Sequence, residues 1–420
     1  MVIAKEKLSY IIYFTVVCLI FADFTNSLPL FFAPIVNKLL YVLVLSYVAV
    51  NFFKLIKLNK NTLAPLLFLL MYSVFLVVKT VYHGEEVFGG VAVAIFYFFM
   101  FFVFISYRQE WSLSKYLRPF LLSTSVILLV SLLVYLGFNI PLYVEDPSVL
   151  ERYAAARNYS LSHNTAFSGA FLNQNTFGAL LLITLISMIF YKSDKANSRF
   201  LFKAMYYTLF FLALLFLVKT MSRSSIFGFA VFVIIYLLSQ VFRLKGIVYL
   251  FFSATLSITI LYLAQDYFLK ILERTQQGGT SHRVDIWADA YSQFTENMAF
   301  GVGNYMYNDW TAHNHFVQVL ASDGIFVFLF MILFFLFFIF RSALIFFSNF
   351  ANTQAFKQKV LFVSSFAAII FHQMFETMLQ SPFSPITLIF FLSLVGLLKG
   401  NSFPSYKNTN LTPIKNQPIN

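Results

Sequence analysis

The sequence predicts an all-α polytopic membrane protein with about twelve transmembrane helices and both termini in the cytoplasm. Of its 420 residues, 60% are hydrophobic and only 11% are charged, whereas soluble domains have about 25% charged residues. Many stretches reach the roughly 20 apolar residues that a membrane-spanning helix needs. Segments such as 326–340 are apolar on every face, which favours helices over the alternating strands of a membrane barrel.

The hydropathy of residues 1–400 predicts one membrane domain. The polar composition of residues 401–420 predicts a disordered cytoplasmic tail. The first apolar segment could be a secretory signal, but Asp23 and Asn26 lie where a small-residue cleavage motif would be. We therefore interpret it as a retained helix. Helices are expected at residues 8–24, 35–53, 63–79, 87–107, 117–137, 170–191, 201–219, 224–242, 246–265, 316–340, 359–378 and 383–398.

Basic residues predict the orientation of these helices. With the N-terminus in the cytoplasm, 20 of the 29 lysines and arginines fall in inner segments, and every inner segment contains some. Cytoplasmic loops of membrane proteins are enriched in this way. The net charge of +12 is therefore spread between apolar spans, which argues against a nucleic-acid-binding protein with a single basic patch.

Two outer connections are much longer than the others, at about 138–169 and 266–315. Loops of this length that are not disordered are usually functional. In the second loop, the apolar residues at positions 284, 287, 288, 291 and 294 recur at helical spacing after Arg283, which predicts a short amphipathic helix along the membrane surface. Its Trp287 would lie at the lipid–water interface.

Arg223 is expected in a very short outer connection, at the start of a helix. Together with the helix N-terminal amides and the hydroxyls of Ser222, Ser224 and Ser225, it would form an anion site. The alternative is an arginine that reaches the interface and ends a membrane span. A basic residue in a tight outer loop works against the predicted orientation, and this favours the anion site.

Arg283 and His313 are two further candidates on the outer side. Arg283 opens the amphipathic helix, where the alternative role is a surface ion pair with Asp285 or Asp289. His313 precedes a long apolar helix, where a neutral imidazole can accept a proton from a hydroxyl; the alternative is a structural histidine. His315 is two residues away, so the two rings do not share a helix face, and we expect no metal site and a structural role for His315.

Two arginines and a histidine on one side of a membrane suggest one chemistry. Arginines bind a diphosphate, and a histidine deprotonates a hydroxyl nucleophile. That combination suits glycosyl transfer from a lipid-diphosphate donor.

Four short motifs follow one another along the chain. The first is Ser-Gly-Ala-Phe-Leu-Asn-Gln-Asn at 168–175, and the second is Ser-Arg-Ser at 222–224. The third is Arg-x-x-x-Trp at 283–287 with Gly-Val-Gly at 301–303, and the fourth is His-Asn at 313–314 with Gly324. In this order they resemble the O-antigen ligase and O-antigen polymerase superfamily, polytopic glycosyltransferases of the bacterial inner membrane.

The resemblance is strongest over residues 157–330, and three positions depart from the family pattern. Gln174 stands where proline is common, His282 replaces a glycine, and Val327 replaces a second glycine. The departure at Val327 puts local packing in doubt rather than the chemistry.

The resemblance implies that Arg223 and Arg283 bind the diphosphate of an undecaprenyl-diphosphate-linked glycan and that His313 is the general base on the acceptor hydroxyl. It implies no cofactor and no metal, and the outer loops have no Asp-x-Asp motif. The active site would face the periplasm, and a regulator of chain length is an additional candidate partner. Residues with expected supporting roles are Asn314, His315, Trp287, Arg157 and Asn175.

The acceptor divides the superfamily into polymerases, which use a lipid-linked repeat unit, and ligases, which use lipid A-core. The length of the second outer loop, about 50 residues, and the residues of the Arg-x-x-x-Trp and His-Asn-His-Phe motifs favour a polymerase of O-antigen, capsule or exopolysaccharide. Ligase and protein O-oligosaccharyltransferase are the alternatives. A flippase or transporter would need charged residues within its helices, whereas Asp323, His372 and Glu376 are expected singly or near helix ends.

Overall fold

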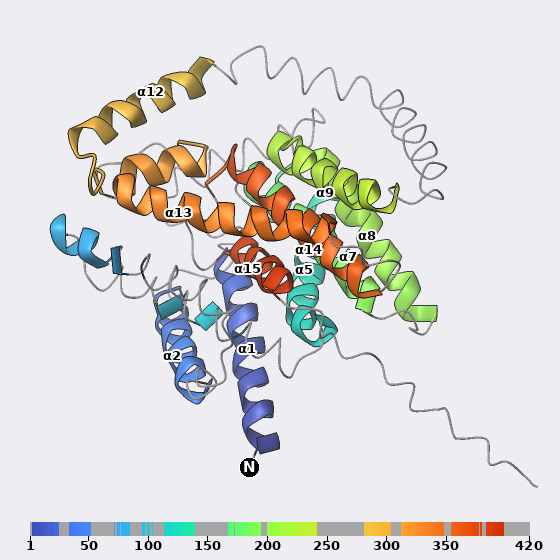
Figure 1. Ribbon diagram of the computed structural model, residues 1–420. Coiled ribbons are helices and arrows are strands. Elements are labelled where there is room, and N and C mark those ends of the chain that lie inside the picture. The colour runs from blue at the N-terminus through green and yellow to red at the C-terminus, as the bar shows by residue number, and fades with distance from the viewer. Residues whose placement is uncertain are drawn as a thin grey trace, which may run out of the picture.

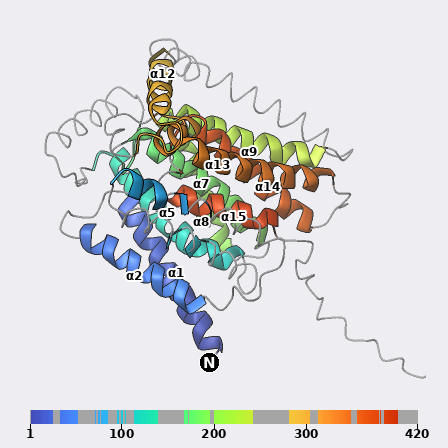
Figure 2. The same cartoon turned by 60° about the vertical axis from the view of Figure 1, so that its left-hand side comes forward.

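The computed structural model describes ten helices and parts of their connections (Figures 1 and 2). All regular secondary structure in the described part of the chain is helical. The described residues are 2–24, 33–51, 71, 74–75, 77–84, 95–96, 99–100, 103, 113–138, 167–171, 173–194, 200–241, 281–303, 312–347, 354–377, 379 and 384–398.

Nine of the predicted membrane helices are described over most of their length. They are α1 (Val2–Phe24), α2 (Ala33–Asn51), α5 (Leu113–Tyr135), α7 (Gln174–Asp194), α8 (Phe200–Thr220), α9 (Arg223–Val241), α13 (His315–Phe347), α14 (Gln354–Gln373) and α15 (Pro385–Leu398).

The other predicted helices are described in part or not at all. Within the predicted helices 63–79 and 87–107, the described residues are helical. The predicted helix 246–265 lies outside the described residues, as do most of the loop 138–169 and the tail 401–420.

Three described helices are long and apolar enough to cross a membrane: Leu113–Tyr135, Gln174–Ser193 and His315–Ile345. Five shorter apolar helices accompany them. Helix α5 also exposes an apolar stripe at helical spacing, which is typical of a surface that faces lipid. The stripe consists of Leu122, Val126, Leu129 and Leu133. An all-helical membrane protein is therefore confirmed, while the count of twelve spans and their orientation stay predictions.

Helices α7, α9, α14 and α15 form the packed centre of the bundle. Small residues let their backbones approach closely, as is common between membrane helices. An added Cβ at Gly396 of α15 would lie 2.2 Å from the Phe362 ring of α14. Ser393 Oγ donates to Ser365 Oγ at 2.7 Å across the same pair of helices. Figure 2 shows α1 and α2 side by side at the edge of this centre.

The amphipathic helix expected in the second long loop is present as α12 (Ser281–Glu296). It packs against α13 and projects from one end of the bundle (Figure 1). Ala290 and Phe294 are buried, but Tyr291, which was expected on the apolar face, is 61% exposed. The helix is therefore confirmed, while its apolar face differs in part from the prediction.

Several helix boundaries differ from the prediction by a few residues, and two differences concern the candidate site. Helix α13 is interrupted at Gly324, which has φ of 79° and ψ of 179°, because a backbone segment packs against it there. Helix α14 ends at Gln373 rather than at 378. As a result Glu376 lies in the turn after the helix, where hydropathy alone could not distinguish it from the last turn of a span.

Candidate active site

Helix α9 begins at Arg223, as the sequence predicts. The turn before it contains Met221 in the left-handed region, with φ of 52°. The Ser222 carbonyl oxygen accepts the Ile226 N–H, with 3.0 Å between oxygen and nitrogen, so Ser222 caps the helix. Arg223 itself is half-buried. A cation at the positive end of a helix dipole is unfavourable by itself and is offset by a bound anion. This place in the fold therefore suits anion binding.

The three serines of this first turn form a buried hydroxyl cluster. Ser222 Oγ donates to Ser225 Oγ at 3.1 Å and lies 3.4 Å from Ser224 Oγ. Ser225 Oγ in turn lies 3.3 Å from Nε2 of His372, on α14. On the other side, a Cβ added to Gly178 of α7 would lie 2.6 Å from Ser222 Cβ. The start of α9 is therefore held between α7 and α14.

His313 precedes α13 and also has a left-handed backbone, with φ of 48°. In the described part of the chain, His313 and Met221 are the two non-glycine residues with positive φ. Such strained conformations concentrate at functional sites. The Nδ1 atom of His313 is buried and lies 3.5 Å from Oε2 of Glu376, although the side chain as a whole is 38% exposed. Glu376 is buried. Its carboxylate therefore lies on the buried side of an imidazole ring that is itself partly accessible to solvent.

Hydrogen bonds on both sides of His313 fix its backbone. Trp287 Nε1 of α12 donates to the Ala312 carbonyl oxygen at 2.8 Å, and the Ala312 N–H donates to Gln318 Oε1 at 2.8 Å. Asn314 Oδ1 accepts the backbone N–H groups two and three residues later, at 3.0 and 3.3 Å. Trp287 and Asn314 therefore help to fix the backbone around His313; their supporting role in catalysis stays a prediction.

The glycines of the third and fourth motifs pack directly against each other. A Cβ on Gly301 would lie 2.6 Å from the Ala321 carbonyl oxygen, and one on Gly324 would lie 2.4 Å from the Ala299 carbonyl oxygen. Both glycines have positive φ. Glycine is therefore required at both positions for two reasons, the backbone conformation and the close approach of two backbones.

A buried ion pair lies next to this contact. Lys79 Nζ donates to Asp323 Oδ1, and both side chains are almost fully buried. Nearby, His83 Nε2 lies 3.4 Å from the Phe300 carbonyl oxygen. The ion pair thus fixes α13 beside its interruption, where the segment that follows α12 is attached.

The remaining predicted residues have different outcomes. Asn175 lies at the start of α7, where its N–H donates to Asn173 Oδ1 at 2.7 Å. His315 is the buried first residue of α13, and its Nδ1 has no hydrogen-bond partner among the described residues. Arg283 lies in the first turn of α12, but its side chain is outside the described residues, and so is the whole of Arg157.

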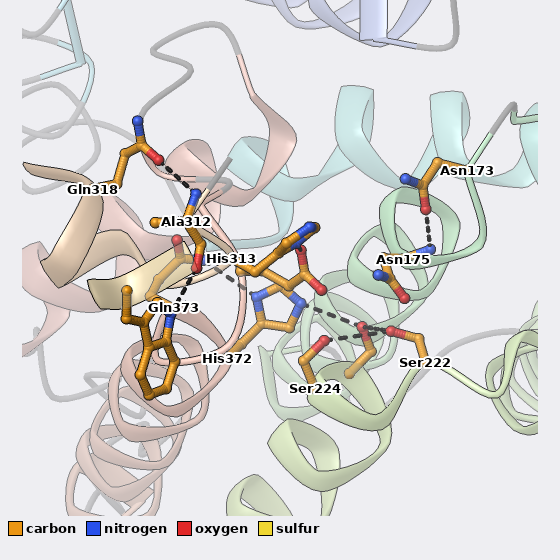
Figure 3. A network of polar contacts seen from close by, with 12 residues as sticks. Asn173, Asn175, Ser222, Ser224, Ala312, His313, Gln318, His372 and Gln373 are labelled. Atoms are coloured by element: carbon orange, nitrogen blue, oxygen red, sulfur yellow. Dashed lines mark hydrogen bonds and ion pairs between the residues drawn. The ribbon is translucent and has the colours of Figure 1, made fainter. Parts of the chain in front are cut away.

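The contacts place the starts of α7, α9 and α13 and the end of α14 at the same end of the bundle. Figure 3 shows these polar contacts near one another, with the pair Asn173 and Asn175 separate from the contacts of His372 and Ser222 and from the contact of His313. Arg223, as the first residue of α9, and His313 therefore lie at the same end of the bundle; that they form one site stays a prediction. No group of three or more His, Cys, Asp and Glu side chains that could hold a metal ion occurs among the described residues.

The sequence analysis missed three polar contacts. Asp323, His372 and Glu376 were expected singly or near helix ends, and His372 and Glu376 do lie at and just after the end of α14. Each of the three also has a polar partner from a distant part of the chain, which the sequence did not indicate. The sequence did contain one signal for these contacts, because ionisable residues within otherwise apolar segments of a membrane protein usually mark a functional site.

Residues 208–332 match the family model described as O-antigen ligase. This match covers less than half of the chain, and it supports the expected resemblance to the O-antigen ligase and polymerase superfamily. It includes Arg223, α12, His313 and Gly324, but not α7 or α14. A comparison with curated proteins found no match. The family match indicates a glycosyltransferase-like enzyme of the O-antigen ligase or polymerase type.

Proposed function

We propose that this protein is a polymerase that transfers a growing glycan from undecaprenyl diphosphate to a lipid-linked repeat unit. The observation that carries the proposal is the placement of His313, backed by the Glu376 carboxylate at 3.5 Å, at the same end of the bundle as Arg223. A base and an anion-binding arginine at one site are what glycosyl transfer from a diphosphate needs. The site would face the periplasm from the bacterial inner membrane.

His313 would act as the general base through Nε2, because Nδ1 is buried against Glu376. The hydroxyl oxygen of the acceptor attacks the anomeric carbon of the donor, and its proton passes to Nε2. The bond between that carbon and the diphosphate oxygen breaks, and undecaprenyl diphosphate leaves. The Glu376 carboxylate stabilises the imidazolium that forms, as the buried acid of a catalytic triad does.

Arg223 would bind the diphosphate together with the start of α9. The negative charge on the diphosphate grows as it leaves, and a fixed guanidinium stabilises that charge without a metal ion. Arg283 is proposed as the second arginine, since its helix is tied to the residue before His313 through Trp287. Arginine also forms paired hydrogen bonds with phosphate oxygens that a lysine cannot form.

Point substitutions test the proposal in cells that make the polysaccharide. His313→Ala, Arg223→Ala and Arg283→Ala are each expected to abolish long chains. Arg341→Ala, near the far end of α13, is the matched control and should retain them. If all three variants still produced long-chain polysaccharide, the proposed chemistry would be refuted.

A ligase is the second candidate, because the matching family model is described as O-antigen ligase. The two activities leave different products when the gene is lost. A missing polymerase leaves single repeat units on lipid A-core, whereas a missing ligase leaves bare core while lipid-linked polymer accumulates. Bare core with accumulated polymer would therefore replace the polymerase proposal with the ligase.

A further inference from the structure

His372 is a buried histidine that lies between the two halves of the site. Its side chain is 1% exposed, and both ring nitrogens have partners. Nδ1 lies 3.2 Å from Gln373 Nε2, and Nε2 lies 3.3 Å from Ser225 Oγ. Its helix leads directly to Glu376, while Ser225 belongs to the first turn of the helix that Arg223 begins. His372 therefore bridges the element that supports the base and the element that presents the arginine.

The hydrogen-bond pattern determines the tautomer of His372. Gln373 Oε1 accepts the backbone N–H of Leu379 at 3.0 Å, which identifies that atom as the amide oxygen. The amide nitrogen therefore faces His372 Nδ1 and donates to it. With Nδ1 as an acceptor, the ring hydrogen lies on Nε2 and is donated to Ser225 Oγ. Both nitrogens are thus occupied, so His372 is not available as the base in place of His313.

Ser225 connects His372 to Ser222, the residue that caps α9. Its oxygen accepts hydrogen bonds from both His372 Nε2 and Ser222 Oγ. Ser222 has no freedom on its other side, where Gly178 lies too close to carry a side chain. The bridge therefore sets where the first turn of α9 and its arginine lie relative to α14.

We propose that His372 is a positioning residue, which through Ser225 and Ser222 holds the diphosphate-binding start of α9 at a fixed place beside Glu376 and His313. The inference rests on the proposed function of Arg223. It assigns His372 to donor binding, and it distinguishes this residue from a histidine that only fills space in the bundle.

The test measures the affinity of the purified full-length protein for undecaprenyl diphosphate, and the KM and kcat of the transfer reaction. Ser225→Ala and His372→Leu are each expected to weaken diphosphate binding roughly three- to ten-fold, the effect of one lost hydrogen bond. The double variant should bind undecaprenyl diphosphate no more weakly than Ser225→Ala alone, because that substitution already removes the contact between the two residues. KM for the donor should rise more than kcat falls.

Two variants serve as controls. His372→Gln keeps an N–H near the position of Nε2, so it should restore most of the affinity lost in His372→Leu. Ser365→Ala removes a buried hydroxyl contact from the same helix, the one to Ser393, and should leave the affinity unchanged. Unchanged binding in Ser225→Ala, or losses that multiply in the double variant, would overturn the inference.

The same binding assay separates this inference from the proposed function. If Arg223→Ala binds undecaprenyl diphosphate as tightly as the parent, the assignment of the arginine itself fails. If Arg223→Ala weakens binding and the His372 and Ser225 variants do not, only the positioning role fails.

Discussion

Replacing Glu376 by Gln keeps the shape of the side chain and removes the charge behind His313. Two unit charges 3.5 Å apart interact by roughly 5 kcal/mol at an effective dielectric constant of 20. The His313 side chain is 38% exposed, so solvent screens part of this interaction. We take about 2 kcal/mol as the amount by which the Glu376 carboxylate stabilises the imidazolium in the transition state. Because about 1.4 kcal/mol corresponds to a factor of ten in rate, kcat should fall about 30-fold.

The assay is polymerisation of a lipid-linked repeat unit by the purified protein, with kcat and KM measured separately. KM should change little, because Glu376 is proposed to act in the transition state and not on the bound substrate. Glu296→Gln is the matched control, since that carboxylate is exposed at the end of α12. The double variant with His313→Ala should be no slower than His313→Ala alone. A Glu376→Gln enzyme within two-fold of the parent, or losses that multiply in the double variant, would refute the reasoning.

Three further substitutions have expected outcomes. Gly324→Ala should destabilise the fold by about 2–5 kcal/mol, because it adds both backbone strain and overpacking. Gly84 also has a positive φ but has open space around it, so Gly84→Ala should show the cost of strain alone. Thermal unfolding of both variants in detergent measures the difference. Asp323→Asn should destabilise by about 3–5 kcal/mol because it leaves Lys79 charged and buried, and adding Lys79→Met should recover part of the loss in the same assay. Arg223→Lys should raise the donor KM about ten-fold or more, because lysine cannot form the paired hydrogen bonds of a guanidinium; donor titrations would contradict this if KM stayed unchanged.

Hydropathy was sufficient to predict the described helices other than α12, because lipid contact requires long apolar segments. It also located the start of α9 at Arg223 and the start of α13 after His313. Motif order predicted that these two residues act together; the contacts of α9 with α14 and of His313 with Glu376 place them at one end of the bundle, and their joint action stays a prediction.

The pairing between helices could not be predicted in the same way. Nothing in the local sequence indicates that Lys79 pairs with Asp323, 244 residues later, or that His372 contacts Ser225. Such contacts depend on which helices are neighbours, and apolar segments of similar composition do not encode this. The interruption at Gly324 was missed for a related reason, since its cause is a backbone segment that follows a different helix.

That interruption has a consequence for how the protein can open to a lipid. Next to Gly324, the N–H groups of Val302 and Gly303 donate to the carbonyl oxygens of residues 321 and 322, and the Ile325 N–H donates to the Met298 carbonyl oxygen. Backbone groups left without partners are costly beside lipid. We therefore expect α12 and α13 to move as one unit, so that an opening for the lipid tail of the proposed donor would lie between this unit and other helices.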